Sequence, residues 1–190
     1  MTDKIIVVEN IVNKRYQDFL ESVFLSDTFP VYFKPDTLGV DYNPADVFID
    51  KNTVDTPQFV HNFVKNHSSS SPEANYIFAI FTEMCEHLKS NYSLYRCKLN
   101  LNYQHPAFDG TTYYAPHKDS SDPFMITGIY YLTDSDGDTI FFDDNKNIIK
   151  RVSPKKGSLV YFNSNIFHAG QSPVKHSIRA VINFMLLPRK

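Results

Sequence analysis

The chain has 190 residues, which is enough for one domain with a substantial hydrophobic core, and we expect residues 1–190 to form a single domain. A net charge of -2 at pH 7 and a sequence pI of about 6.4 provide no basic surface for a phosphate backbone, so the composition does not favour nucleic acid as a partner. The apolar run near the amino terminus is too short for a signal peptide or a membrane span. It therefore predicts a soluble, cytoplasmic protein with no membrane partner.

Three helices are predicted in the first half of the chain. Apolar residues at helical spacing predict the first helix over residues 14–25. A second helix is expected to open at Thr56-Pro57 and to continue to Val64, because threonine and proline are favoured at the first helical positions. By the same logic, a third runs from Ser71 to about Lys89 and includes Cys85. These helices are expected to cover one sheet.

The second half of the chain is rich in short β-strand patterns. These strands are predicted at residues 125–132, 139–142, 158–162 and 179–187. Turn-forming residues at 134–138 and 154–157 separate them, as expected between antiparallel strands. The predicted fold class is α+β, mainly β, with a two-sheet barrel or jelly roll.

Candidate metal ligands occur among these strands. In His117-Lys118-Asp119, a strand would point the imidazole and the carboxylate to the same face, and His168 follows another apolar, strand-like run. Taken singly, these residues also fit a polar strand end and a hydrogen-bonded core imidazole. Two imidazoles and one carboxylate leave open positions for a chelating ligand and dioxygen, which is typical of non-haem Fe(II).

Arg179 is a candidate for binding an acidic ligand. A solvated charge at a strand end is the simpler alternative, but the apolar run that follows Arg179 predicts a buried strand. An unpaired buried guanidinium is costly, so a buried anion is the expected partner. The planar guanidinium matches a carboxylate in a bidentate pair.

The stretch from Tyr103 to Leu187 resembles the Fe(II)- and 2-oxoglutarate-dependent oxygenases, most closely their prolyl 4-hydroxylase-like branch. The resemblance rests on Tyr114-x-x-His117-x-Asp119, on residues 129–134, 137–142 and 152–162, and on the segment from His168 to Arg179, all in the family's order. It implies a double-stranded β-helix (jelly roll) core at about residues 92–188, buttressed by N-terminal helices.

The resemblance also implies the site and its cofactors. Fe(II) would be bound by His117, Asp119 and His168, and Arg179 would complete the catalytic set by holding 2-oxoglutarate. Tyr131, Tyr103 and Tyr114 would be further contacts to this cosubstrate. Dioxygen is the other cosubstrate, and ascorbate is an optional addition. The implied reaction is hydroxylation of a carbon centre, with a prolyl residue as one candidate, and 2-oxoglutarate would be decarboxylated to succinate.

Two alternative functions remain. An AlkB-like nucleic-acid demethylase would carry a second arginine downstream on the strand of Arg179, and residues 180–187 contain none. A non-catalytic jelly-roll binding module would bind metal without releasing succinate. Within the favoured function, the substrate is a small molecule or a peptide, namely a peptidyl proline, a free amino acid or another metabolite. The expected lining is aromatic, with Tyr113, Tyr114 and Phe167 as candidates.

Overall fold

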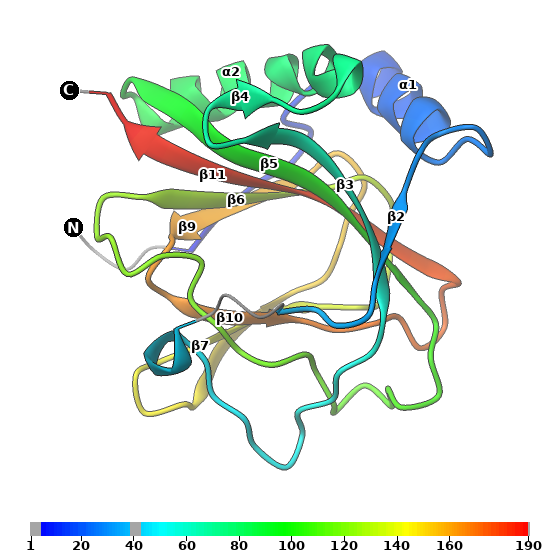
Figure 1. The fold of residues 1–190 in the computed structure, drawn as a ribbon, viewed down its shortest axis with the longest axis vertical. Coiled ribbons are helices and arrows are strands. Elements are labelled where there is room, and N and C mark those ends of the chain that lie inside the picture. The colour runs from blue at the N-terminus through cyan, green and yellow to red at the C-terminus, as the bar shows by residue number, and fades with distance from the viewer. Residues whose placement is uncertain (1–4, 39–42, 190) are drawn as a thin grey trace.

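The computed structural model describes residues 5–38 and 43–189. Most of the regular structure in these ranges is antiparallel β, arranged in two sheets that face each other (Figure 1). The larger sheet has the strand order β1-β9-β6-β11-β5-β3-β2, and β4 pairs with β3. The smaller sheet has the order β10-β7-β8. The prediction of a mainly β, antiparallel fold is confirmed.

The strands have the following bounds. Those of the larger sheet are β1 (Ile6–Val8), β2 (Tyr32–Lys34), β3 (Gln58–Lys65), β4 (Ser68–Ser69), β5 (Tyr92–Tyr103), β6 (Ile126–Tyr131), β9 (Leu159–Asn163) and β11 (Ile178–Pro188). Those of the smaller sheet are β7 (Thr139–Phe142), β8 (Ile148–Val152) and β10 (Phe167–Gly170). The four strands predicted between residues 125 and 187 correspond to β6, β7, β9 and β11.

Helices α1 and α2 lie on the outer face of the larger sheet (Figure 1). Helix α1 (Lys14–Phe24) confirms the first predicted helix, and the Asn13 side chain caps it by accepting a hydrogen bond from the Tyr16 N–H. The predicted 71–89 helix is a 3₁₀-helix (Pro72–Ile77) followed by α2 (Phe78–Leu88). The Ser71 side chain makes no capping hydrogen bond, because its hydroxyl contacts His61 instead. A short 3₁₀-helix (Pro44–Asp46) completes the helical segments. Within ranges 5–38 and 43–189, no helix is long and apolar enough to cross a membrane.

The helix predicted from Thr56 to Val64 is wrong, because this segment forms β3. It pairs with β2 on one side and with β5 on the other, so its backbone groups are satisfied by strand ladders. Its side chains alternate as in a strand: Phe63 joins the core beneath the helices, whereas Gln58 faces the opposite side. Pairing between distant segments therefore outweighed the local helix-start signal.

The larger sheet has one apolar and one polar face. On the face toward the helices, residues from β5 and β11 pack with Leu20, Ile80 and Met84 in the main core. These strand residues are Cys97, Leu99, Leu101, Ala180, Ile182 and Phe184. The intervening residues face the smaller sheet and line a cavity between the two sheets. The cavity therefore has a rigid, well-packed wall behind it.

Candidate functional site

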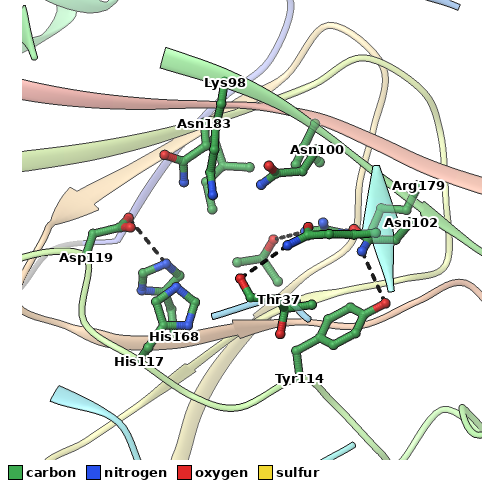
Figure 2. Close-up of a pocket in the computed structure, with 15 residues that line it drawn as sticks. Thr37, Lys98, Asn100, Asn102, Tyr114, His117, Asp119, His168, Arg179 and Asn183 are labelled. Carbon is green, nitrogen blue, oxygen red and sulfur yellow. Dashed lines mark hydrogen bonds and ion pairs between the residues drawn. The ribbon is translucent and has the colours of Figure 1, made fainter. Parts of the chain in front are cut away.

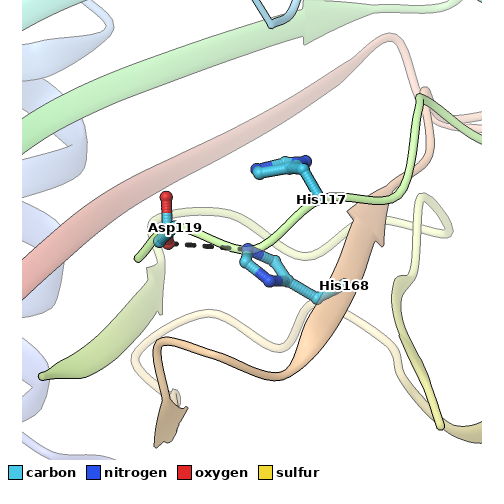
Figure 3. Close-up of side chains that lie close together, drawn as sticks. All are labelled: His117, Asp119 and His168. Atoms are coloured by element: carbon cyan, nitrogen blue, oxygen red, sulfur yellow. Dashed lines mark ion pairs between the residues drawn. The ribbon is translucent and has the colours of Figure 1, made fainter. Parts of the chain in front are cut away.

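The structure brings His117, Asp119 and His168 together at one end of this cavity (Figure 3). Their candidate ligand atoms all lie within 4.8 Å of one another, and His168 Nε2 lies 3.6 Å from Asp119 Oδ2. His117 and Asp119 lie in a loop rather than in a regular strand. His117 nevertheless forms an isolated antiparallel bridge with His168 of β10, and each backbone N–H donates to the other residue's carbonyl over 2.9 Å. This bridge sets the two imidazoles side by side.

Both imidazoles are oriented by backbone carbonyls. Nδ1 of His117 lies 3.0 Å from the Ala115 carbonyl oxygen, and Nδ1 of His168 lies 3.1 Å from that of Ile166. Because a carbonyl oxygen only accepts, each Nδ1 carries the proton, and Nε2 is the unprotonated ring nitrogen. Burial lowers the pKa of His168. Burial and the neighbouring His168 together lower the pKa of His117 to about 3. Both rings are therefore neutral at pH 7, which is the form that binds a metal.

Side chains from two strands of the larger sheet hold Asp119. Its Oδ1 accepts a 2.8 Å hydrogen bond from Arg96 of β5, and its Oδ2 accepts one of 2.8 Å from the Thr127 hydroxyl of β6. Its side chain is 2% exposed. Burial alone would raise the pKa of Asp119, but Arg96, the two imidazoles and Thr127 outweigh burial and hold the pKa well below its usual value. The residue is therefore a fixed carboxylate.

Arg179 lines the same cavity from β11. The residue is 4% exposed, its Nε donates to the Gly137 carbonyl over 2.7 Å, and a terminal nitrogen donates to Thr139 Oγ1 over 2.9 Å. Both acceptors are neutral, and no carboxylate among the described residues forms an ion pair with it. This fits the expectation of a buried guanidinium that awaits an anion.

The predicted tyrosine contacts lie in three different environments. Tyr114 lines the cavity, and its hydroxyl is hydrogen-bonded to Asn102, Thr56 and Ser172. Tyr131 is fully buried behind the lining, and its hydroxyl donates to Thr139, the residue that also accepts from Arg179. Tyr103 is 49% exposed and packs edge-on against Phe59, outside the cavity lining.

The expected aromatic lining is largely replaced by polar side chains. Tyr113 packs against Phe142 and donates to Asp50, and Phe167 packs against Phe48, so neither lines the cavity. The polar residues that line it and were absent from the sequence prediction are Thr37, Gln58, Lys98, Asn100, Asn102, Thr139 and Asn183 (Figure 2).

A sequence signal for part of this lining exists in β5. From residue 96 to 102, polar and apolar residues alternate, which indicates a strand with one polar and one apolar face. Lys98, Asn100 and Asn102 occupy the polar face, and Figure 2 shows them directed into the cavity with Asn183 beside them. Burial and the neighbouring cations Arg96 and Lys34 lower the pKa of Lys98 to about 7, although Asp119 opposes this shift.

Comparisons with known proteins match the segment in which the sequence resembles the Fe(II)- and 2-oxoglutarate-dependent oxygenases. Residues 101–186 match the 2OG-Fe(II) oxygenase superfamily. A search of curated protein sequences finds no significant match. Similar solved structures include a 2OG-Fe(II) oxygenase family oxidoreductase from Burkholderia pseudomallei (9% identity, TM-score 0.70), which covers 98% of this chain and 86% of that one.

Two further similar structures are prolyl hydroxylases. The viral collagen prolyl hydroxylase from Paramecium Bursaria Chlorella virus-1 is 16% identical with a TM-score of 0.59, and the match covers 96% of each chain. A prolyl-4-hydroxylase from Pseudomonas putida is 13% identical with a TM-score of 0.59, and the match covers 100% of this chain and 95% of that one. The matched segment, residues 101–186, contains His117, Asp119, His168 and Arg179.

Proposed function

We propose that the chain is a 2-oxoglutarate-dependent Fe(II) dioxygenase that hydroxylates a carbon centre and converts 2-oxoglutarate to succinate and carbon dioxide. One observation carries the proposal: the cluster of His117, Asp119 and His168 lines the same cavity as Arg179, and Arg179 forms no ion pair with a carboxylate of the described residues. The two facing sheets support the finer assignment of a double-stranded β-helix core.

The residues present fit a divalent iron ion. Two neutral imidazoles with unprotonated Nε2 atoms and one fixed carboxylate form the donor set expected for non-haem Fe(II). When bound there, Fe(II) supplies the activation of dioxygen and the oxidation of the substrate C–H bond. The Ala115 and Ile166 carbonyls orient the imidazoles, and Arg96 and Thr127 orient the carboxylate.

Arg179 binds and orients 2-oxoglutarate in this proposal. Its side chain is fixed by Gly137 and Thr139, so its remaining N–H groups are set in place before the ligand arrives. The distal carboxylate of the cosubstrate supplies the missing anion, and the 2-oxo acid end extends toward the metal ligands. Tyr131 acts through Thr139, and Tyr114 lines the cavity between them. Tyr103 lies outside this arrangement.

The substrate is a small molecule or a peptide. The two prolyl hydroxylases among the similar structures support a prolyl residue as one candidate, and a free amino acid and another metabolite are the other candidates. By the family resemblance, a halogenase would leave the position of the Asp119 carboxylate to halide, so the presence of Asp119 supports hydroxylation.

Anaerobic loading with Fe(II), followed by assay of succinate release from 2-oxoglutarate, tests this function. The unsubstituted chain should bind one iron ion and release succinate slowly even without a substrate. His168→Ala should lose most of the bound iron, whereas the exposed control His87→Ala should retain it. Full iron occupancy in a folded His168→Ala would refute the metal site. Iron binding without any succinate release would instead favour the non-catalytic binding module.

A further inference from the structure

A second cationic side chain faces the same cavity, some distance from Arg179. In the ladder between β5 and β11, Lys98 lies opposite Asn183, and Asn102 lies opposite Arg179. Four residues along a strand correspond to about 13 Å, so the two cations enter the cavity at well-separated positions. Figure 2 shows Lys98 directed toward the space above the His117, Asp119 and His168 cluster, with Arg179 on the opposite side.

Several polar groups around Lys98 lack partners among residues 5–38 and 43–189. Among these residues, the Lys98 ammonium has neither a hydrogen-bond acceptor nor a carboxylate in an ion pair. Within the same ranges, the buried side-chain oxygens of Asn100 and Asn183 and the buried Nε–H of Arg96 have no partner. Buried polar groups without partners are costly, so this cluster fits a ligand that carries both an anionic acceptor and a donor.

The adjoining recess has an excess of positive charge. It has a volume of about 620 Å³, shares Lys98 and Asp119 with the inner cavity, and is also lined by Lys34, Arg96 and Lys118. Its carboxylates are Asp46 and Asp119, and Asp119 is engaged by Arg96 and Thr127. Lys34 and Lys118 form ion pairs with Asp36 and Asp144 outside the lining, which leaves Lys98 as the cation for a ligand. A recess of this size is typical of small-molecule sites.

We propose that Lys98 binds an anionic group, a carboxylate or a phosphate, of a small-molecule substrate, so that the enzyme acts on an acidic metabolite. This inference rests on the proposed function, in which one carboxylate of 2-oxoglutarate is held by Arg179 and the 2-oxo acid end by the metal. Lys98 then pairs with a second anion, and Asn100 and Asn183 accept hydrogen bonds from donors next to that anion. Lys98 is therefore a specificity residue rather than a part of the oxidation chemistry.

Calorimetric titration of matched probes tests this proposal. The full chain is loaded anaerobically with Fe(II) and saturated with 2-oxoglutarate. It is then titrated with pairs that differ in charge, namely aspartate and asparagine, N-acetylproline and N-acetylprolinamide, and glycerol 3-phosphate and glycerol. At least one anionic probe should bind about 10- to 100-fold more tightly than its neutral partner, as expected for a charge-assisted hydrogen bond. The pair that shows the preference distinguishes a carboxylate from a phosphate.

Substitutions at Lys98 test whether this residue causes the preference for anionic probes. Lys98→Met should abolish it, Lys98→Arg should keep it, and Lys51→Met, which removes an exposed lysine elsewhere, should leave it unchanged. If Lys98→Met does not fold, as judged by thermal unfolding, Lys98→Gln takes its place. The affinity for 2-oxoglutarate, titrated separately, should be the same in the Lys98 variants and in the unsubstituted chain.

Three results would overturn the proposal: no anionic probe binds more tightly than its neutral partner, the preference persists without the Lys98 charge, or the loss of that charge weakens 2-oxoglutarate binding by a similar factor. The last result would place Lys98 in the cosubstrate site. Failure of the unsubstituted chain to bind 2-oxoglutarate would overturn the proposed function and this inference together. Retained 2-oxoglutarate binding without a preference for anions would overturn this inference alone.

Discussion

Arg179 is positioned by neutral oxygen atoms rather than by an acid. The Gly137 carbonyl and the Thr139 hydroxyl accept from it, and the Tyr131 hydroxyl donates to the same Thr139 oxygen. This arrangement satisfies part of the guanidinium without neutralising its charge. The charge is therefore available to an incoming carboxylate, and the planar shape of the group sets the direction of that pair.

Arg179→Lys should weaken 2-oxoglutarate binding by about 1–3 kcal/mol, because the charge remains but the bidentate geometry is lost. Tyr131→Phe should have a smaller effect, about 0.5–1.5 kcal/mol, since it removes one neutral hydrogen bond behind the lining. Titration of the metal-loaded protein with 2-oxoglutarate measures both changes. Unchanged affinity in Arg179→Lys would remove Arg179 from the cosubstrate site.

At the scale of elements, the connection between β6 and β7 determines where Arg179 lies. An added Cβ atom at Gly137 would lie 2.5 Å from the Gln171 carbonyl oxygen and 2.9 Å from Arg179 Cδ. The first of these atoms belongs to the backbone and has little freedom to move. Glycine at 137 is therefore required by the close approach of this connection to the chain that follows β10.

Gly137→Ala should destabilise the fold by about 1–3 kcal/mol through overpacking, and it should also weaken 2-oxoglutarate binding by displacing Arg179. Gly170→Ala is the matched control for stability, because an added Cβ atom there would come no closer than 3.4 Å to Arg179, although Gly170 lines the cavity. Chemical unfolding of both variants and 2-oxoglutarate titration of Gly137→Ala provide the measurements. Equal losses of stability in the two variants would contradict this account of Gly137.

At the scale of the whole molecule, a short surface loop connects β10 to the largely buried strand β11. Asp136 holds this loop by accepting hydrogen bonds from the backbone N–H groups of Val174, Lys175 and His176, and from the His176 ring. Burial alone would raise the pKa of Asp136, but these hydrogen bonds outweigh burial and lower the pKa to about 2.

A depressed pKa means that the stabilisation by Asp136 is complete above its ordinary value of 3.8 and is lost as the pH falls toward about 2. Asp136→Asn should lower the free energy of unfolding by about 1–2 kcal/mol at pH 7, and the difference should shrink between pH 4 and pH 2. Urea unfolding at several pH values measures this effect, with the exposed Asp27→Asn as control. A difference independent of pH would show that the Asp136 charge does not stabilise the loop.

Part of this fold could be predicted because its signals are local. Apolar spacing in residues 14–25 indicates α1, and turn residues around 134–138 and 154–157 separate strands that do form. For the segment 58–65 the local signal is misleading, because Thr56-Pro57 resembles a helix start whereas the segment forms a strand. It becomes β3 because β2 and β5 lie on either side of it, and both neighbours are distant in the sequence.

By itself, the sequence determined the residue types of the proposed metal site, the order of the strands that carry them and the presence of Arg179 after the distal histidine. Only the tertiary structure decided what surrounds these residues. The pairing of Arg96 with Asp119, and the cavity that Lys98 shares with His168 and Arg179, depend on segments that lie far apart in the sequence. Side-chain alternation tells which residues share a face of a strand, but the register between strands decides which of those faces meet.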